Sequence, residues 1–274
     1  MRRLWGVGLS ELYSLHVSVP CQSYSGAMGQ ENKHRHSEGT PRDEVGRDAD
    51  ALLAKMAALA VAVQNANARV LITFENPWSE NGLFLGSAPV RDLLARPGWV
   101  QWNFDYCTNT DLYLPDGGVN ENSVDARVHP DGFPRKRSTF VGHGLPANVG
   151  DYYPMCQFDC PFLFEDSSRF AGRRHRNVIC TGGKRSVPGQ RMVVGAQRSA
   201  IPAGVFIKLH RLHDEWVLSR VRPSGAPSGQ EASVMKLRVR SAAAVTAFLE
   251  YQAAQRRIRN GWKPSDARAG PGRC

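Results

Sequence analysis

Long apolar runs are missing from this sequence, and so are internal repeats. No stretch reaches the roughly 18 consecutive apolar residues that a membrane-spanning helix requires, so we expect no transmembrane segment and no membrane partner. The apolar stretch after the charged start Met1-Arg2-Arg3 is broken by Ser10 and Glu11, and we therefore predict no secretion signal. An intracellular protein is expected, in either the nucleus or the cytoplasm. The lack of repeats argues against a repeat architecture.

Acidic residues are comparatively scarce. The chain has 25 Asp and Glu against 35 Lys and Arg, which gives a net charge of +10. An excess of this size indicates a polyanionic partner, DNA above all, although a merely soluble basic surface is the alternative. Residues 169–198 contain eight Lys and Arg and no Asp or Glu. This segment is therefore the best candidate for a phosphate-facing surface.

Cysteine is sparse as well, with six in 274 residues. Because no secretion signal is expected, we take the thiols to be reduced, which favours metal binding or catalysis over a disulfide framework. Cys107 follows a predicted strand and is interpreted as a core residue rather than a ligand. Cys274 lies in a Pro- and Gly-rich tail and is assigned no role.

Four soft ligands nevertheless fall within 25 positions, as Cys156-x3-Cys160 and His175-x4-Cys180. A tetrahedral zinc ion bound by Cys156, Cys160, His175 and Cys180 could stabilise this coil-rich stretch, which has little core of its own. The spacing differs from the usual Cys-x2-Cys pair. The alternative is a set of unrelated reduced cysteines and a surface histidine.

The rest of the chain alternates between predicted strands and helices, which indicates an α/β fold. Apolar β-branched runs predict strands, and apolar residues at helical spacing predict helices. The predicted strands are 15–19, 69–74, 99–106 and 138–141, and the predicted helices are 43–65, 90–94 and about 201–218. We divide the chain into an α/β domain over 1–142, an irregular basic insertion over 143–195, a closing strand and helix over 196–220, and a linker, basic helix and tail over 221–274.

The stretch Leu15–Ser25 carries the first candidate site residue. Pro20 ends the predicted strand because it has no N–H to donate, and Cys21 then lies just past the carboxyl end of that strand. Ligands and reacting groups gather at this end of open α/β sheets. A thiol here could act as a nucleophile, while the alternative is a structural cysteine packed as a small hydrophobe.

Two further pieces follow in order along the chain. Glu75-Asn76-Pro77 follows the second predicted strand, which repeats the arrangement at Cys21. The basic segment Gly132–Arg137, with the sequence Gly-Phe-Pro-Arg-Lys-Arg, precedes the last predicted strand. Taken singly, the first could be an ordinary strand-ending turn and the second a solvated run of charges.

Together, Pro20-Cys21-Gln22, Glu75-Asn76 and Gly132–Arg137 resemble the DNA (cytosine-5) methyltransferases, in this order and strand context. Glu75-Asn76-Pro77 is most similar to the divergent, phage-type branch of that family. The segment 197–202 is similar to its closing motif, so the resemblance covers roughly residues 12–212. It implies a partial Rossmann-like, class I methyltransferase sheet with an irregular insertion and a C-terminal helix.

The resemblance also implies a role for each piece. The thiolate of Cys21 would add to carbon 6 of cytosine, so that carbon 5 can attack a methyl group of S-adenosylmethionine. Glu75 would support the charge that develops at ring nitrogen 3, and Arg137 would help to hold the base. The base must leave the DNA stack, and the loop 22–44 is placed to fill the gap. Residues expected to contact substrate or DNA are Gln22, Ser25, Asn76, Arg135, Lys136, Arg173, Arg174 and Arg176.

One part of the family pattern is missing. The family has a Gly-rich loop after its first strand, which cradles the methyl donor, and no segment here matches it. The donor site is therefore expected to be incomplete, in a truncated enzyme or one whose second half comes from another chain. Smaller departures are Arg135, Thr139 and Ser199, which stand where the family has glutamine, arginine and asparagine.

Two other interpretations stay open. The chain could be a non-catalytic, basic nucleic-acid-binding protein that keeps a degenerate methyltransferase scaffold. It could also be a thiol enzyme of another kind, in which His16 or His34 acts as the base for Cys21.

Overall fold

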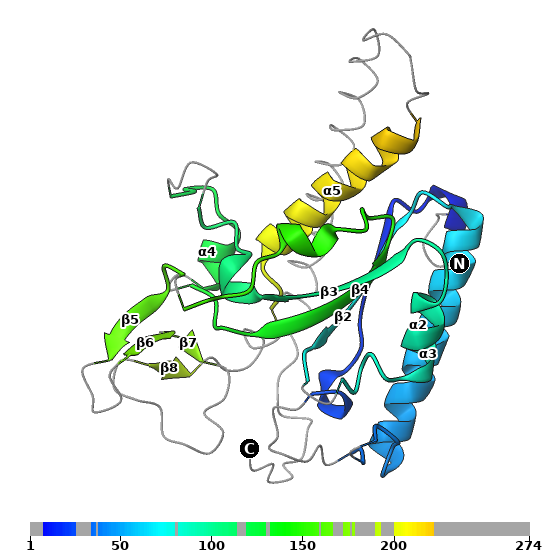
Figure 1. Ribbon diagram of the computed structural model, residues 1–274, viewed down its shortest axis with the longest axis horizontal. Helices are drawn as coiled ribbons and strands as arrows, with labels where there is room; N and C mark the ends of the chain where they lie inside the picture. The colour runs from blue at the N-terminus through cyan, green and yellow to red at the C-terminus, as the bar shows by residue number, and fades with distance from the viewer. Residues whose placement is uncertain are drawn as a thin grey trace, which may run out of the picture. The chain divides into compact units, whose positions relative to one another are not determined.

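A computed structural model gives the fold of the chain (Figure 1). The residues that it describes are 8–25, 34–36, 38–79, 82–113, 119–129, 132–158, 160–166, 172–175, 177–178, 190–192 and 200–221. Arg176, Cys180, Ser199 and the segment 222–274 lie outside these ranges, so the predictions made for them are not addressed. The same holds for the side chains of Gln22, Arg173 and Arg174.

A mixed four-stranded sheet forms the centre of the α/β fold. Its strands are β1 (Ser14–Ser18), β2 (Leu71–Pro77), β3 (Trp99–Asp105) and β4 (Arg137–His143), in the order β1-β2-β4-β3. β1 and β2 are parallel, whereas β4 is antiparallel to both β2 and β3. The carboxyl ends of β1, β2 and β3 and the start of β4 consequently lie at one edge of the sheet.

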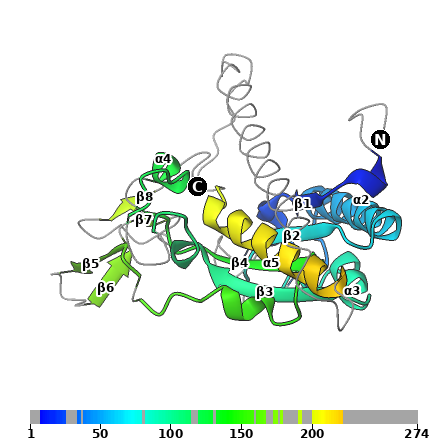
Figure 2. The ribbon, with the colours of Figure 1, turned by 90° about the horizontal axis from the view of Figure 1, so that it is seen from above.

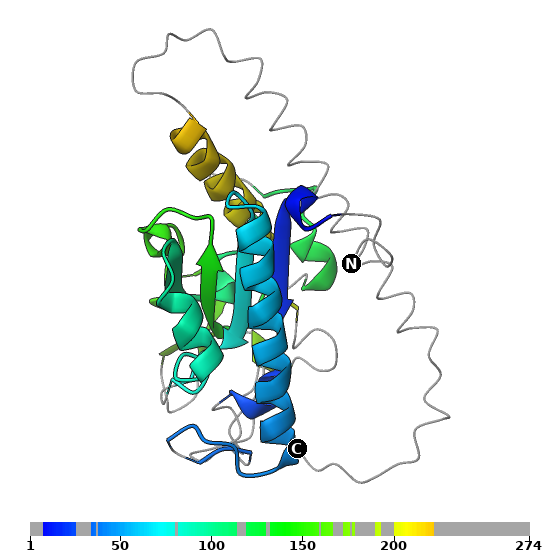
Figure 3. The same cartoon turned by 90° about the vertical axis from the view of Figure 1, so that its right-hand side faces the viewer.

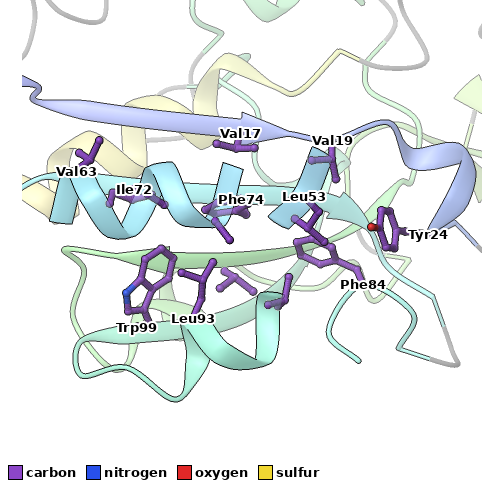
Figure 4. Packing of buried hydrophobic residues seen from close by; sticks show 14 of the residues in the cluster. Val17, Val19, Tyr24, Leu53, Val63, Ile72, Phe74, Phe84, Leu93 and Trp99 are labelled. Carbon is purple, nitrogen blue, oxygen red and sulfur yellow. The ribbon is translucent and has the colours of Figure 1, made fainter. Parts of the chain in front are cut away.

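Helix α2 (Glu44–Ala66) covers one face of the sheet and runs along the strands (Figure 3). Asp43 caps it by accepting a hydrogen bond from the Gly46 N–H at 2.9 Å. Its buried residues recur at helical spacing, and they pack with α3 (Ala88–Leu94) and the apolar face of the strands (Figure 4). The labelled core residues are Val17, Val19, Tyr24, Leu53, Val63, Ile72, Phe74, Phe84, Leu93 and Trp99.

By length and composition alone, α2 is also apolar enough to cross a membrane, although no unbroken apolar run is present. Its buried positions, from Gly46 to Val63, form one stripe against the sheet. This is the arrangement of a helix in a protein core.

Helix α5 (Ala203–Val221) crosses the strands in Figure 2 and packs on the sheet through Phe206, whose ring lies edge-on to that of His16. The buried carboxylate of Asp125 accepts hydrogen bonds from the N–H groups of Ala203 and Gly204, at 2.7 and 3.2 Å. These are N–H groups that an α-helix leaves unpaired, so Asp125 acts as its cap. The helix predicted from residue 201 is confirmed.

The remaining elements are short. They are η1 (Leu9–Glu11), η2 (Cys21–Ser23), η3 (Tyr106–Thr108), α4 (Asp125–Val128), η4 (Val149–Tyr152), β5 (Leu163–Asp166), β6 (Gly172–His175), β7 (Asn177–Val178) and β8 (Arg191–Met192). β5 pairs with β6, and β7 with β8. The stretch predicted to be irregular, 143–195, therefore contains two small two-stranded sheets.

Two predicted strands differ in detail from the structure. Leu15–Val19 was expected to be buried on most sides, but β1 is an edge strand whose only neighbour among the described strands is β2, and most of its residues are half-buried or exposed. The strand predicted to end at Phe74 continues to Pro77 as β2, so Glu75-Asn76-Pro77 belongs to the strand and is not the strand-ending turn considered as the alternative. The strand extends because Asn76 and Pro77 pair with Thr139 and Ser138 of β4.

The histidines near α5 predict a loss of stability in acid. Burial is the main cause that lowers the pKa of His16 and His210 to about 4, and it also lowers the pKa of His143 and His213. The Glu75 charge opposes the shift at His16, and the Asp214 charge opposes it at His210. The unfolded chain takes up these protons below about pH 6.5, so the folded state loses stability as pH falls from there towards 4.

We expect the free energy of unfolding, measured in urea, to be lower at about pH 5 than at about pH 7.5, by roughly 2 kcal/mol for each of His16 and His210. His210→Gln should reduce this dependence. Replacing His36, which is exposed, with Ala should leave it unchanged. Equal free energies at the two pH values would contradict the prediction.

Candidate functional site: a carboxylate site and a cysteine–histidine cluster

Glu75 is the centre of a hydrogen-bonded site at the sheet edge. Its side chain is 3% exposed and accepts hydrogen bonds from three hydroxyls. Tyr106 and Ser138 donate to Oε1, at 2.8 and 2.7 Å, and Ser18 donates to Oε2 at 2.8 Å. The ammonium of Lys136 lies 3.5 Å from Oε1. Glu75 therefore has a cation and three donors from β1, β4 and the segments that flank β3 and β4.

These partners fix the charge of Glu75. Burial raises the pKa of this carboxyl, but the Lys136 ammonium and the three hydroxyl donors together outweigh burial and hold the pKa below its usual value. Glu75 is thus ionised near neutral pH. Burial and the charge of Glu75 in turn raise the pKa of Tyr106 well above its ordinary value, so that Tyr106 stays a neutral donor.

Cys21 lies at the same edge, in the short helix η2 directly after β1. Its thiol is exposed, which favours the nucleophile over the structural cysteine considered as the alternative. Cys21 and Glu75, predicted together from the sequence, thus lie at the same end of two adjacent parallel strands, Cys21 just after β1 and Glu75 near the end of β2.

Arg35 connects the turn that carries Cys21 to Asp50 of α2. The guanidinium of Arg35 donates from Nε to the carbonyl and the hydroxyl of Ser23, at 2.7 and 2.9 Å, and forms an ion pair with Asp50. The guanidinium of Arg35 stacks on the ring of Tyr24, with its Cζ 4.2 Å from the centre of the ring. This buried arginine gives the exposed thiol a fixed support.

Arg137 reaches a different carboxylate. Its Nε lies 3.5 Å from Oδ1 of the buried Asp105, and its guanidinium lies over the ring of Trp78. Lys136 instead approaches Glu75, together with Ser138. The reason is the alternation of side chains along an extended chain, which puts residues 136 and 138 on one face and 137 on the other.

The other predicted substrate residues contact protein groups, and two of them, Asn76 and Ser25, are buried. Asn76 is fully buried, and its Nδ2 donates to the carbonyl of Val19 at 3.3 Å, which joins β2 to the segment before Cys21. Ser25 is also buried. Arg135 binds Asp105 and the carbonyl of Cys156, both at distances of 3.3 to 3.4 Å. The predicted contacts of these residues with DNA stay predictions.

The two histidines considered as bases for Cys21 are engaged elsewhere. Nδ1 of His16 lies 2.8 Å from the hydroxyl of Thr73, and burial keeps the ring neutral. Nδ1 of His34 lies 2.7 Å from the carboxylate of Asp43 at the start of α2. Each ring is thus bonded through Nδ1, and the interpretation as a base for Cys21 stays a prediction.

A second cluster lies next to the carboxylate site. The ligand atoms of four buried side chains all lie within 4.8 Å of one another. They belong to Cys107 in η3, to Cys156 and Cys160 in the loop after η4, and to His175 in β6. This cluster could hold a metal such as zinc.

Three members of the zinc set expected from the sequence are thus brought together, and the fourth position is taken by Cys107. Cys107 is buried in a small apolar cluster, as predicted for a core residue, and its thiol also lies close to the other three potential ligands. The spacing of the cysteines could not identify Cys107 as a potential ligand, because it follows β3 and lies far upstream of Cys156, Cys160 and His175. Its position directly after a strand was the available signal.

Contacts within the cluster shift the pKa values of its thiols in opposite directions. A hydrogen bond from Cys107 is the largest cause that lowers the pKa of Cys160, and a hydrogen bond with His175 adds to it. The same bond with Cys160, followed by burial, raises the pKa of Cys107.

The two sites share the end of β3. Asp105 binds Arg135 and Arg137, and its Oδ2 accepts a hydrogen bond from the N–H of Cys156 at 2.9 Å. Tyr106, the next residue, donates to Glu75, and Cys107 then enters the cluster. Three successive residues thus connect the carboxylate site to the cysteine–histidine cluster.

Comparisons with known proteins give no relative. No family model, curated protein or solved structure matches this chain. The methyl-donor site stays a matter of prediction, and among the described residues the segments directly after β1 and β3 are not Gly-rich. The first of these segments contains Pro-Cys-Gln, and the second is Tyr-Cys-Thr.

Proposed function

We propose that this chain activates cytosine in DNA, as the base-binding part of a DNA (cytosine-5) methyltransferase built on a partial Rossmann-like, class I sheet. The observation that carries the proposal is the placement of an exposed Cys21 and an ionised Glu75 at the same end of two adjacent parallel strands. The mixed sheet and the order of the three sequence motifs support it.

The proposed reaction begins with a covalent bond between Cys21 and the base. The thiolate adds to carbon 6, and the π electrons of the 5,6 double bond move to carbon 5. Glu75, being ionised, accepts a hydrogen bond from the exocyclic amino group. Lys136 beside it donates to ring nitrogen 3 and offsets the charge that the ring gains.

Without a methyl donor, this addition can still be detected through exchange of the hydrogen at carbon 5. Carbon 5 of the adduct takes a proton from water, then loses its original hydrogen to water, and the sulfur leaves with the electrons of its bond to carbon 6. The base is restored with a solvent hydrogen at carbon 5. Because the sequence has no match to the family's Gly-rich donor loop, methyl transfer itself would need a donor site from another segment or a second chain.

DNA binding would rest on the basic character of the chain. The net charge of +10 suits phosphate contacts. The hairpin β5–β6 carries Arg173 and Arg174, and Arg176 follows it in the sequence. The target base has to leave the duplex to reach a thiol at a sheet edge, as it does in other enzymes that modify bases.

Exchange of hydrogen at carbon 5 tests the proposal. Duplex DNA is incubated with the full chain in deuterated water, and deuterium in its cytosines is measured by mass spectrometry. We expect exchange with the wild type and with Cys274→Ser, and none above background with Cys21→Ser. DNA binding by Cys21→Ser should be retained and remain sensitive to salt.

A second candidate function is non-catalytic DNA binding on a degenerate scaffold, which the net charge of +10 favours. The same experiment separates the two. DNA that is bound by the wild type without exchange at carbon 5 would overturn the catalytic proposal in favour of this one. Exchange that persists unchanged in Cys21→Ser would exclude Cys21 as the nucleophile.

A further inference from the structure

We propose that Cys107, Cys156, Cys160 and His175 bind one Zn²⁺ in a closed tetrahedral site. The four side chains are buried and reach the site from three separate segments of the chain. Three thiolates and an imidazole form a ligand set typical of structural zinc, which fills all four positions with protein. This inference does not depend on the proposed function.

The distances agree with such a site. Nε2 of His175 lies 3.4 Å from Sγ of Cys156 and 3.1 Å from Sγ of Cys160. Zinc bonds of about 2.3 Å to sulfur and about 2.0 Å to nitrogen, at tetrahedral angles, separate these atoms by about 3.5 Å. All four ligand atoms already lie within 4.8 Å of one another, so only small shifts are needed.

The backbone around the cysteines is arranged to support negative sulfur. The N–H of Phe158 donates to the thiol of Cys156, and the N–H of Phe162 donates to the thiol of Cys160. Each donor lies two residues after its cysteine, and Phe158 adopts a left-handed conformation with φ of 59°. A strained turn that aims an amide at sulfur suits a metal-bound thiolate better than an ordinary core thiol.

The surroundings show what the metal would stabilise. Apart from the cysteines themselves, the described apolar packing here consists of Phe162 and Leu163, which are only partly buried. A zinc ion would join the end of β3 to the loop after η4 and to β6, and so close two long loops. It would also fix Arg173 and Arg174, which precede His175 in β6.

Zinc content tests this ligand set. Full-length protein is purified, equilibrated with excess zinc, freed of unbound metal and analysed by mass spectrometry. We expect about one zinc per chain in the wild type and in the control Cys180→Ser, and strongly reduced zinc in Cys107→Ser. Cys180 was the fourth ligand expected from the sequence, so the two variants compare the alternatives directly.

Cobalt substitution keeps the inference testable if Cys107→Ser fails to fold. Cobalt in the wild type should give the absorption of a tetrahedral ion and a charge-transfer band with the intensity of three thiolate ligands. A wild type that retains no zinc and gives no such spectrum would overturn the inference. So would zinc that is lost in Cys180→Ser but kept in Cys107→Ser, or kept in both.

Discussion

Glu75→Gln is expected to slow hydrogen exchange at carbon 5 of cytosine by about 10²- to 10³-fold, the usual effect of removing one group that stabilises developing charge. Glutamine keeps the shape of the side chain but removes the negative charge that faces Lys136 and accepts from three hydroxyls. The ammonium of Lys136, which is 13% exposed, would lose its carboxylate partner.

The exchange assay is run with Glu44→Gln as the matched control, because Glu44 is an exposed glutamate in the first turn of α2. This control should exchange at the wild-type rate. Circular dichroism checks that both variants are folded. A rate for Glu75→Gln within a few-fold of the wild type would show that Glu75 does not take part.

Lys136→Met gives a separate readout of the same site. The Lys136 charge opposes burial at Glu75, so its removal should raise the pKa of Glu75. Because the reaction uses ionised Glu75, the acidic limb of the pH–rate profile should move to higher pH. A purely structural role for Lys136 would lower the rate without moving that limb.

Removal of zinc is expected to have the second largest effect, on stability. A structural zinc site contributes its binding free energy to folding, which amounts to about 10 kcal/mol or more in small zinc domains. Here part of the fold stands on its own core, so we expect a chelator to lower the thermal midpoint of unfolding by several degrees at least. Added zinc should restore it.

The effect should also reach the carboxylate site. Cys107 directly follows Tyr106, which donates to Glu75, and the N–H of Cys156 binds Asp105. Loss of the metal should therefore lower the rate of hydrogen exchange together with the thermal midpoint. A protein that is shown to contain zinc but has the same midpoint after complete chelation would contradict this account.

The strands and helices were largely predictable because their signals are local. The apolar spacing within 43–65 and the Pro202 start of the last helix fixed α2 and α5. The extent of β2 was not predictable, because its last residues are held by pairing with β4 and not by their own sequence. The edge position of β1 depends on strand order in the same way.

The residues of the candidate sites were likewise predictable only where their signal is local in the sequence. Cys21 follows β1 and Glu75 lies near the end of the adjacent parallel strand β2, so strand ends were sufficient to place both at the same end of the sheet. Tyr106 and Ser18 were missed because their hydroxyls meet Glu75 only in the folded sheet. Cys107 was assigned to the core because no spacing connects it with Cys156 across so much intervening chain.

The most direct test of the central claim uses DNA in which the target cytosine is replaced by 5-azacytosine. Nitrogen at ring position 5 takes up a proton after the thiolate adds at carbon 6, and it slows release of the sulfur without any methyl donor. The account predicts a covalent complex on a denaturing gel, with the DNA base attached to the peptide that contains Cys21. DNA binding without a covalent complex, or attachment at another cysteine, would contradict it.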